Sequence, residues 1–245
     1  RTLLACCLSI YIWPLQTAKA HEGHHDQHVK VLFVVGNYIS MDVATMTKAF
    51  YKAHPDLKGV VRISMTTKAD WDLGVDHDKE FSSADLIFFD VHSIRIATDV
   101  QDGFPSEPIR AAKKRGARMY AVGQTAGMDD QYAALGLWYK DQIRQYWEFD
   151  GYVNRMNMLR LVLKTDFGYH DLPVDPPQIP PQFGYYHFDS AAGRIFESFD
   201  SYAAWYRQSG FYKEGAPWAG FLTFRSFFYN GQTRVDDAII AGLEK

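Results

Sequence analysis

The chain has 245 residues, 47% of them hydrophobic and 16% aromatic, and its formal net charge at pH 7 is −3. A chain of this length and apolar content can bury the core of one domain or somewhat more. The chain has 26 basic and 29 acidic residues, and neither sign forms a long run. The composition therefore argues against a nucleic-acid-binding protein and against an acidic tail.

The first twenty residues have the layout of a secretory signal peptide. An apolar stretch over residues 3–15 precedes the small-residue triplet Ala-Lys-Ala at 18–20. The stretch is too short to span a bilayer, and a buried strand or helix is the alternative interpretation. We expect residues 1–20 to be cleaved after Ala20 and the mature protein to be periplasmic or envelope-located. Both cysteines, Cys6 and Cys7, lie before this site, so no disulfide is expected, and a lipoprotein anchor through either is the weaker alternative.

A histidine-rich tail occupies residues 21–28. Imidazoles are common ligands for zinc, copper and nickel, and four within eight residues raise the local ligand concentration. A closed site also needs fixed geometry and supporting hydrogen bonds, which the neighbouring residues do not supply. Both metal capture and a solvated tail therefore stay open for the candidate ligands His21, His24, His25 and His28.

Residues 29–168 alternate between strand-like and helix-like patterns. A continuous apolar run predicts a strand buried on both faces at 31–35, and residues 60–65, 84–90 and 118–123 are the further predicted strands. Helical spacing and capping signals predict helices over 41–53, 105–115, 128–147 and 151–163. This alternation predicts an α/β fold with a doubly wound, mostly parallel sheet of the Rossmann or flavodoxin type.

Polar residues follow the predicted strands, where ligands of such sheets bind. They form no recognisable catalytic set, and they are Asn37, Tyr38, Ser40, Thr66, Thr67, His92, Ser93, Gln124 and Thr125. The loop at 36–41 is neither a dinucleotide fingerprint nor a P-loop. A free-standing flavodoxin-like or amidotransferase-like enzyme is disfavoured because the chain has no nucleophile elbow and no reactive cysteine.

Five prolines within residues 169–182 predict an extended linker. Beyond it, residues 183–245 predict the start of a second α/β unit. The expected order is a loop, a helix over 197–208, a buried strand over 218–226, a glycine turn and a helix from 235.

Two stretches carry a family resemblance. The first contains Tyr186-His187-Phe188-Asp189, an aromatic helix with Tyr202, Trp205 and Tyr206, the pair Arg225-Ser226, and Ala238-Ile239-Ile240. The second contains Asp150-Gly151 followed by Asn154. In this order they resemble the large subunits of the cobalt and magnesium chelatases, the CobN-type and H-type subunits. That family has "YHPD", "Y-x-x-WY", a strand ending in Arg-Ser, "D-A-L-I-x-x-L-E" and, upstream, "Y-x-x-x-G-G-x-x-N".

The match has two departures, Phe188 for the family's Pro and Asp150 for its first Gly. Because members of the family are several times longer and the chain begins with Arg, we interpret it as the N-terminal portion of such a subunit.

The resemblance implies a subunit that binds a tetrapyrrole, such as a cobalamin precursor or haem, and inserts or removes its metal. Cobalt, magnesium or iron would then be a substrate, no cofactor is expected on this segment, and ATP would act only through separate subunits. A tetrapyrrole needs apolar walls and basic groups for its carboxylates, and the candidate substrate-binding residues are Tyr186, His187, Trp205 and Arg225. Each has a structural alternative: His187 can satisfy a turn, the aromatic residues can form core, and Arg225 can pair with Asp236 or Glu244.

The expected partners are the tetrapyrrole and other chelatase subunits or membrane transport components, with no nucleic acid. The resemblance leaves the catalytic residues unassigned. Export would separate the protein from cytoplasmic ATP, which favours a relative that binds an imported tetrapyrrole or removes its metal. The competing class is a periplasmic, non-enzymatic module that binds a metal or a small ligand.

Overall fold

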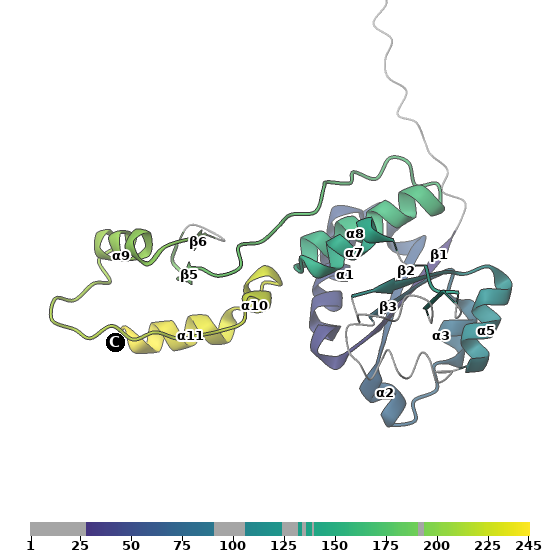
Figure 1. The fold of residues 1–245 in the computed structure, drawn as a ribbon, viewed down its shortest axis with the longest axis horizontal. Coiled ribbons are helices and arrows are strands. Elements are labelled where there is room, and N and C mark those ends of the chain that lie inside the picture. The colour runs from purple at the N-terminus through teal and green to yellow at the C-terminus, as the bar shows by residue number, and fades with distance from the viewer. Residues whose placement is uncertain (1–27, 91–105, 124–131, 134–135, 139, 191–193) are drawn as a thin grey trace, which may run out of the picture.

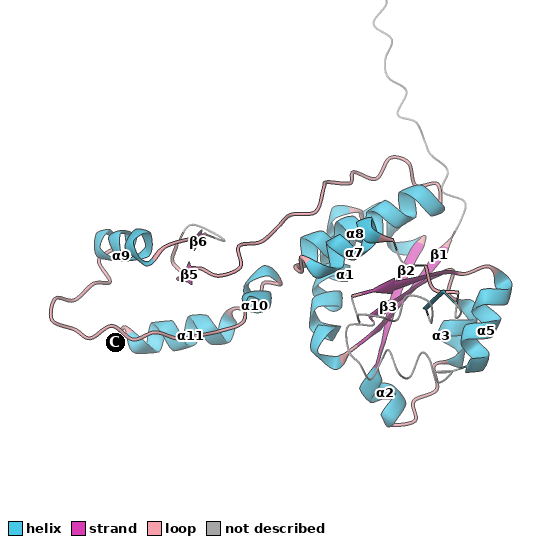
Figure 2. Cartoon of the chain, viewed as in Figure 1, coloured by secondary structure: helices cyan, strands magenta, loops and turns pink. Residues whose placement is uncertain are grey.

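The computed structural model describes residues 28–90, 106–123, 132–133, 136–138, 140–190 and 194–245. Its centre is a four-stranded parallel sheet (Figures 1 and 2), whose strands are β1 Val29–Val35, β2 Val61–Thr67, β3 Leu86–Asp90 and β4 Arg118–Val122. The order across the sheet is β2-β1-β3-β4, so β1 pairs with β2 on one side and with β3 on the other. The direction of strand addition therefore reverses beside β1, as in a doubly wound sheet. The fold class predicted for this part of the chain is confirmed.

Helices cover both faces of the sheet (Figure 1). One face carries α1 Ser40–Ala53, α7 Asp141–Glu148 and α8 Tyr152–Asp166, and the other carries α3 Asp78–Ser83 and α5 Ser106–Arg115. Shorter elements connect them, namely η1 Asn37–Ile39, η2 Pro55–Gly59 and α2 Lys68–Asp72. Within the described parts of the chain, no helix combines the length and apolar character needed to span a membrane.

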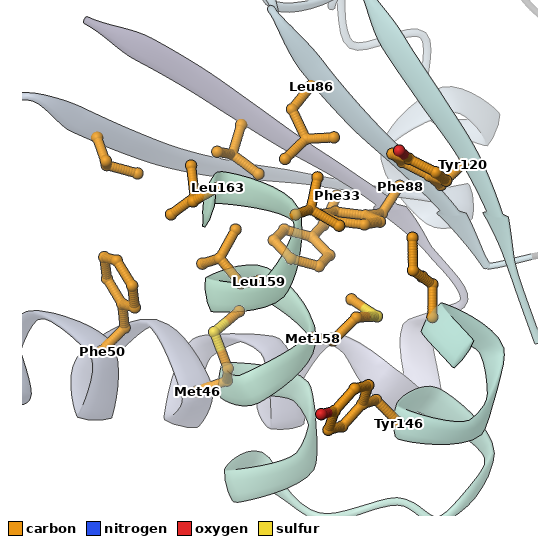
Figure 3. Packing of buried hydrophobic residues seen from close by; sticks show 14 of the residues in the cluster. Phe33, Met46, Phe50, Leu86, Phe88, Tyr120, Tyr146, Met158, Leu159 and Leu163 are labelled. Carbon is orange, nitrogen blue, oxygen red and sulfur yellow. The ribbon is translucent and has the colours of Figure 1, made fainter. Parts of the chain in front are cut away.

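The larger core lies between the sheet and the α1, α7 and α8 layer (Figure 3). Successive residues of β1 point to opposite faces, so Val31 and Phe33 enter this core while Leu32 and Val34 enter the core under α3 and α5. Phe33 stacks on Phe88 of β3 with 4.9 Å between ring centroids. Because both faces are covered, the central strands β1 and β3 carry continuous apolar runs, whereas the edge strand β2 contains the exposed Arg62 and Ser64.

The predicted helix over residues 128–147 is interrupted at 136–140, whereas its last part is helical, as α7 Asp141–Glu148. Trp138 lies alongside β4, where its backbone N–H donates to Met119 and its carbonyl accepts from Ala121. Gly136, with φ +79°, turns the chain just before this contact. The chain therefore adds a short bridge to the sheet before α7 begins at Asp141.

Residues 169–182 contain no helix or strand, as the prolines predict. The segment is nevertheless held against α7 and α8. Asn154 both donates to the carbonyl and accepts from the N–H of Gln178, each at 2.8 Å, and Tyr146 donates to the Asp175 carbonyl at 2.6 Å. These bonds fix the direction in which the chain leaves α8.

The C-terminal segment, residues 183–245, has little strand. It contains β5 Tyr185–Tyr186, β6 Ile195–Phe196, α9 Phe199–Gln208, α10 Arg225–Tyr229 and α11 Arg234–Leu243. β5 and β6 pair antiparallel, and α9 and α11 lie away from the main sheet (Figure 1). The helices from 197 and 235 are confirmed to within two residues, starting at Phe199 and Arg234.

The strand predicted over 218–226 is wrong. Its first part is irregular and its last two residues begin α10. Leu222 is 95% exposed and Phe224 is 74% exposed. An apolar run becomes a strand only where a neighbour offers a hydrogen-bonding edge, and no other described segment pairs with this one.

We expect truncation of Leu159, on the buried face of α8, to be costly. Leu159 is fully buried in the larger core, so Leu159→Ala should lower the free energy of unfolding by about 2–5 kcal/mol. Leu73 is 81% exposed, so Leu73→Ala should change it by less than about 0.5 kcal/mol. Urea unfolding of both variants followed by circular dichroism makes the measurement, and equal losses would contradict the packing described here.

Candidate functional site

A buried guanidinium lies where the sheet unit, residues 29–168, meets the C-terminal segment, residues 183–245. Arg155 of α8 is 1% exposed. Its Nη2 donates to Asp150 Oδ1 at 2.6 Å, and its Nη1 lies 3.4 Å from Asp42 Oδ2 and donates to Asn230 Oδ1 at 3.1 Å. The guanidinium also lies over the Trp147 ring, 5.0 Å from its centroid. One side chain thus joins α1, α7, the start of α8 and the end of α10.

The turn before α8 gives Arg155 this position. Asp150 has φ +62° and Gly151 has φ +83°, two consecutive residues in the left-handed region. Asp150 is the one non-glycine residue with positive φ among the described residues, and its carboxylate accepts from the Gly151 N–H at 2.8 Å. A Cβ on Gly151 would meet Tyr229 Cβ at 3.3 Å, so this position requires glycine for its conformation and for its close contact with α10.

Asp42 is the most perturbed carboxylate of the cluster. Burial raises the pKa of Asp42 to about 6, Asp150 adds to that shift, and Arg155 opposes it. Its Oδ1 accepts from the Gln232 side chain at 2.8 Å. We call Asp42, Asp150, Arg155, Asn230 and Gln232 the junction. It contains one guanidinium and two carboxylates, an excess of one negative charge when both acids are ionised.

A cleft of about 400 Å³ opens beside the junction, at the carboxyl edge of the sheet. Its walls come from the loops after β1 and β4, from α1 and α7, and from the start of α10. The lining residues are Tyr38, Ile39, Asp42, Gly123, Trp147, Glu148, Asp150, Arg155, Arg225 and Ser226. Tyr38 donates to Asp90 at the end of β3 at 3.1 Å, and burial raises the pKa of its phenol.

The cleft combines both charge signs with apolar walls.

Three of the predicted site residues form an aromatic cluster in the C-terminal segment. His187 is fully buried, and its ring centroid lies 5.0 Å from that of Trp205 and 4.7 Å from that of Phe211. Next to it, Tyr186 donates to Asp237 of α11 at 2.8 Å. The structure therefore brings Tyr186, His187 and Trp205 together between β5, α9 and α11.

The hydrogen bonds of His187 define its tautomer. The Asp189 N–H donates to Nδ1 at 3.1 Å, so Nε2 of the neutral ring carries the proton and donates it to Glu244 at 2.8 Å. Glu244 also bonds the Tyr206 hydroxyl, and burial together with this bond raises the pKa of Tyr206 to about 12. Both nitrogens of His187 are thus engaged, and they hold the end of α11 to β5 and α9.

Arg225, the fourth predicted residue, lies at the cleft and not in the aromatic cluster. Neither alternative partner takes it, because Asp236 accepts from Thr223 and Glu244 bonds His187. Within the described residues its guanidinium forms no ion pair, and Arg225 is one of the residues that line the cleft.

The histidine-rich tail is mostly beyond what the structure describes. His21, His24 and His25 lie outside the described residues, as do the strand-end residues His92, Ser93, Gln124 and Thr125, while His28 is exposed. The described residues contain no group of three or more His, Cys, Asp or Glu side chains placed to hold a metal ion.

The family comparison bears on the second half of the chain. Residues 144–245 match the family model described as CobN/Magnesium Chelatase. This part of the chain is therefore similar to the CobN/magnesium chelatase family. A structure comparison aligns 67% of the chain with 12% of the catalytic subunit of cobaltochelatase from Mycobacterium tuberculosis, at 13% identity and a TM-score of 0.41. The chain thus spans 12% of the length of that subunit. A comparison with curated proteins finds no match.

The chelatase-family span includes most of the features described above. It starts within α7 and contains the four predicted substrate-binding residues and every junction residue except Asp42. It also contains the Asp150-Gly151 turn, where the family pattern has two glycines. Both positions have positive φ in this structure, and glycine adopts positive φ without strain. This conformation explains why the family pattern has glycine at both positions.

Removing the junction guanidinium should be strongly destabilising. Arg155→Ala leaves the buried Asp42 and the partly buried Asp150 without their cation, and we expect a loss of about 3–5 kcal/mol in the free energy of unfolding. The matched control is the exposed Arg62 of β2, whose change to Ala should cost less than about 0.5 kcal/mol. Chemical unfolding at pH 7 measures both, and a loss for Arg155→Ala no larger than that of the control would contradict the junction.

Proposed function

We propose that the chain is part of the large, tetrapyrrole-binding subunit of a cobalt or magnesium chelatase-like protein, which inserts metal into a tetrapyrrole or removes it. The observation that carries this proposal is the family match over residues 144–245. Cobalt, magnesium or iron is then the substrate, and separate subunits supply any ATP-driven step.

The chemistry of the C-terminal segment supports a flat, aromatic, carboxylated ligand. Tyr185, Phe199 and Trp218 are 39%, 44% and 45% exposed, and their rings contact one another in series at centroid distances of 5.7 and 5.2 Å. Exposed rings of this kind provide stacking area for a macrocycle. Arg225 lies apart from these rings, in the lining of the cleft, where it provides a guanidinium for a ligand carboxylate.

The buried His187 ring packs on Tyr206, which in turn contacts Trp218 of this aromatic surface. Its two nitrogens are bonded to Asp189 and Glu244, so the family's histidine acts in this proposal by holding β5 and α11 in place. Tyr186, which donates to Asp237 of α11, acts in the same way. A hydrogen bond or metal bond from the Tyr186 hydroxyl or from a His187 nitrogen to the tetrapyrrole complex requires these bonds to open.

We also propose that the protein is exported, on the basis of its first twenty residues. An exported relative would handle an imported tetrapyrrole such as haem, with membrane transport components or other chelatase subunits as partners.

Porphyrin titration tests the first proposal. The purified protein, titrated with haem and with metal-free porphyrin, should show a shift in the ligand's absorption band at micromolar concentration. Arg225→Ala should weaken this binding about tenfold or more, because it removes a charged hydrogen-bond donor, whereas Arg62→Ala should not. The absence of any spectral shift would contradict the proposal, and metal binding by the histidine-rich tail alone would favour the non-enzymatic module.

Export has a separate test. We expect the mature protein in the periplasmic or envelope fraction to begin at His21, as measured by N-terminal sequencing. Ala18→Arg should block cleavage, because the site requires small residues. An uncleaved chain recovered in the cytoplasmic fraction would contradict export and would leave the chelatase assignment untouched.

A further inference from the structure

The cleft beside the junction is formed by both parts of the chain. The sheet unit provides most of its walls, and α10 of the C-terminal segment provides Arg225 and Ser226. The cleft lies at the carboxyl edge of the sheet, next to β1, where the direction of strand addition reverses. Open α/β sheets bind their ligands at this position. A volume of about 400 Å³ suits one small molecule.

Two of the charged side chains that line the cleft already have partners. Glu148 lies 3.5 Å from Arg144 on the same helix. Both oxygens of Asp42 are engaged, because Oδ1 accepts from Gln232 at 2.8 Å and Oδ2 lies 3.4 Å from Arg155. A ligand would have to displace one of these partners to bind either acid.

Asp150 has one carboxylate oxygen that is still open. Its Oδ1 accepts from the Gly151 N–H at 2.8 Å, from Arg155 at 2.6 Å and from Asn230 at 3.4 Å. Its Oδ2 accepts no hydrogen bond within the described residues, and the Asp150 side chain is 17% exposed. Because Asp42 and Asp150 share one guanidinium, this open oxygen carries the excess negative charge of the junction.

Arg225 supplies the opposite charge from the other part of the chain. It is half-buried in the cleft lining, and its guanidinium forms no ion pair within the described residues. Asp150 and Arg225 therefore line one cleft with opposite charges and do not pair with each other. A partly buried charge without a partner is costly, so a ligand that matches both charges is stabilised by both.

Apolar side chains complete the walls of the cleft. Tyr38 and Ile39 of η1 and Trp147 of α7 are part of the lining, and Tyr38 is 58% exposed. The Tyr38 hydroxyl donates to Asp90 at 3.1 Å, which fixes the direction of the ring. Aliphatic or aromatic groups of a ligand can pack on these side chains.

We propose that this cleft binds a free amino acid with an apolar side chain, whose ammonium donates to Asp150 and whose carboxylate accepts from Arg225. A simple carboxylate would leave Asp150 unmatched, and a simple amine would leave Arg225 unmatched. The amino acid would join the sheet unit to the C-terminal segment. The proposal goes beyond the chelatase function, and a tetrapyrrole carboxylate at Arg225 would compete with the amino acid.

Calorimetric titration in the absence of porphyrin tests this proposal. The probes are L-leucine and L-phenylalanine, and at least one should bind with a Kd of about 1 mM or tighter. The matched analogues of leucine are 4-methylpentanoate, which lacks the ammonium, and 3-methylbutylamine, which lacks the carboxylate. For phenylalanine they are 3-phenylpropanoate and 2-phenylethylamine. Each analogue should bind about tenfold more weakly or worse, because it loses a charge-assisted hydrogen bond.

Two variants test the two contacts separately. Arg225→Ala should weaken binding of the amino acid about tenfold or more, whereas Arg234→Ala, at an exposed arginine of α11, should not. Asp150→Asn keeps an oxygen for Arg155, and asparagine tolerates the positive φ at this position. It should weaken the amino acid about tenfold and leave the analogue without the ammonium bound as tightly as before or more tightly.

Three outcomes would overturn the proposal. They are no binding of either amino acid at millimolar concentration, analogues that bind as tightly as the amino acid, and an Asp150→Asn variant that weakens the amino acid and its carboxylate analogue equally. Porphyrin titration of the same protein separates this inference from the chelatase function. A porphyrin shift without amino acid binding contradicts the amino acid site alone, and amino acid binding without a porphyrin shift contradicts the chelatase function alone.

Discussion

The structure depends on the pairing of one buried guanidinium with carboxylates from two separate places in the chain. Arg155 lies in the first turns of α8, Asp42 in the first turn of α1 and Asp150 in the turn between α7 and α8. A buried charge without partners is strongly destabilising, so these segments must meet for the chain to fold. Asn230 then joins the same group from the C-terminal segment. One interaction thus fixes both the helical layer over the sheet and the point where the following segment docks.

The sheet could be predicted from the sequence because burial on both faces leaves a local signal. Runs such as Val31–Val35 are apolar at every position, and only a covered parallel strand needs that pattern. The run over 218–226 carries the same local signal, yet it is irregular and largely exposed in the described structure. Hydrophobicity reports an affinity for burial, whereas a strand also needs a neighbouring edge. The break at Gly136, with its positive φ, was likewise hidden inside an otherwise helical pattern.

The candidate site was only partly predictable, for a related reason. Residue order was enough to find Tyr186, His187 and Trp205, because these lie close together along the chain. Arg155 gave no such signal, since an arginine on a helix is usually a solvated residue and its partners lie at positions 42 and 230. The sequence showed Asp150 as a departure from the family's two glycines. Only the backbone angles show that both positions of this turn have positive φ. Contacts between residues so distant in sequence leave no trace in spacing or periodicity.

The chelatase-family span does not coincide with a structural boundary. It begins inside α7, and α7 and α8 form much of the apolar layer that covers one face of the sheet. Met158, Leu159 and Leu163 pack against Phe33 and Leu86 from strands upstream of the span (Figure 3). Residues 144–168 therefore cannot bury their apolar face without the preceding sheet, and one of the two carboxylate partners of Arg155, Asp42, lies upstream of the span. The upstream sheet is a physical part of the unit that presents the family motifs, although the family model does not include it.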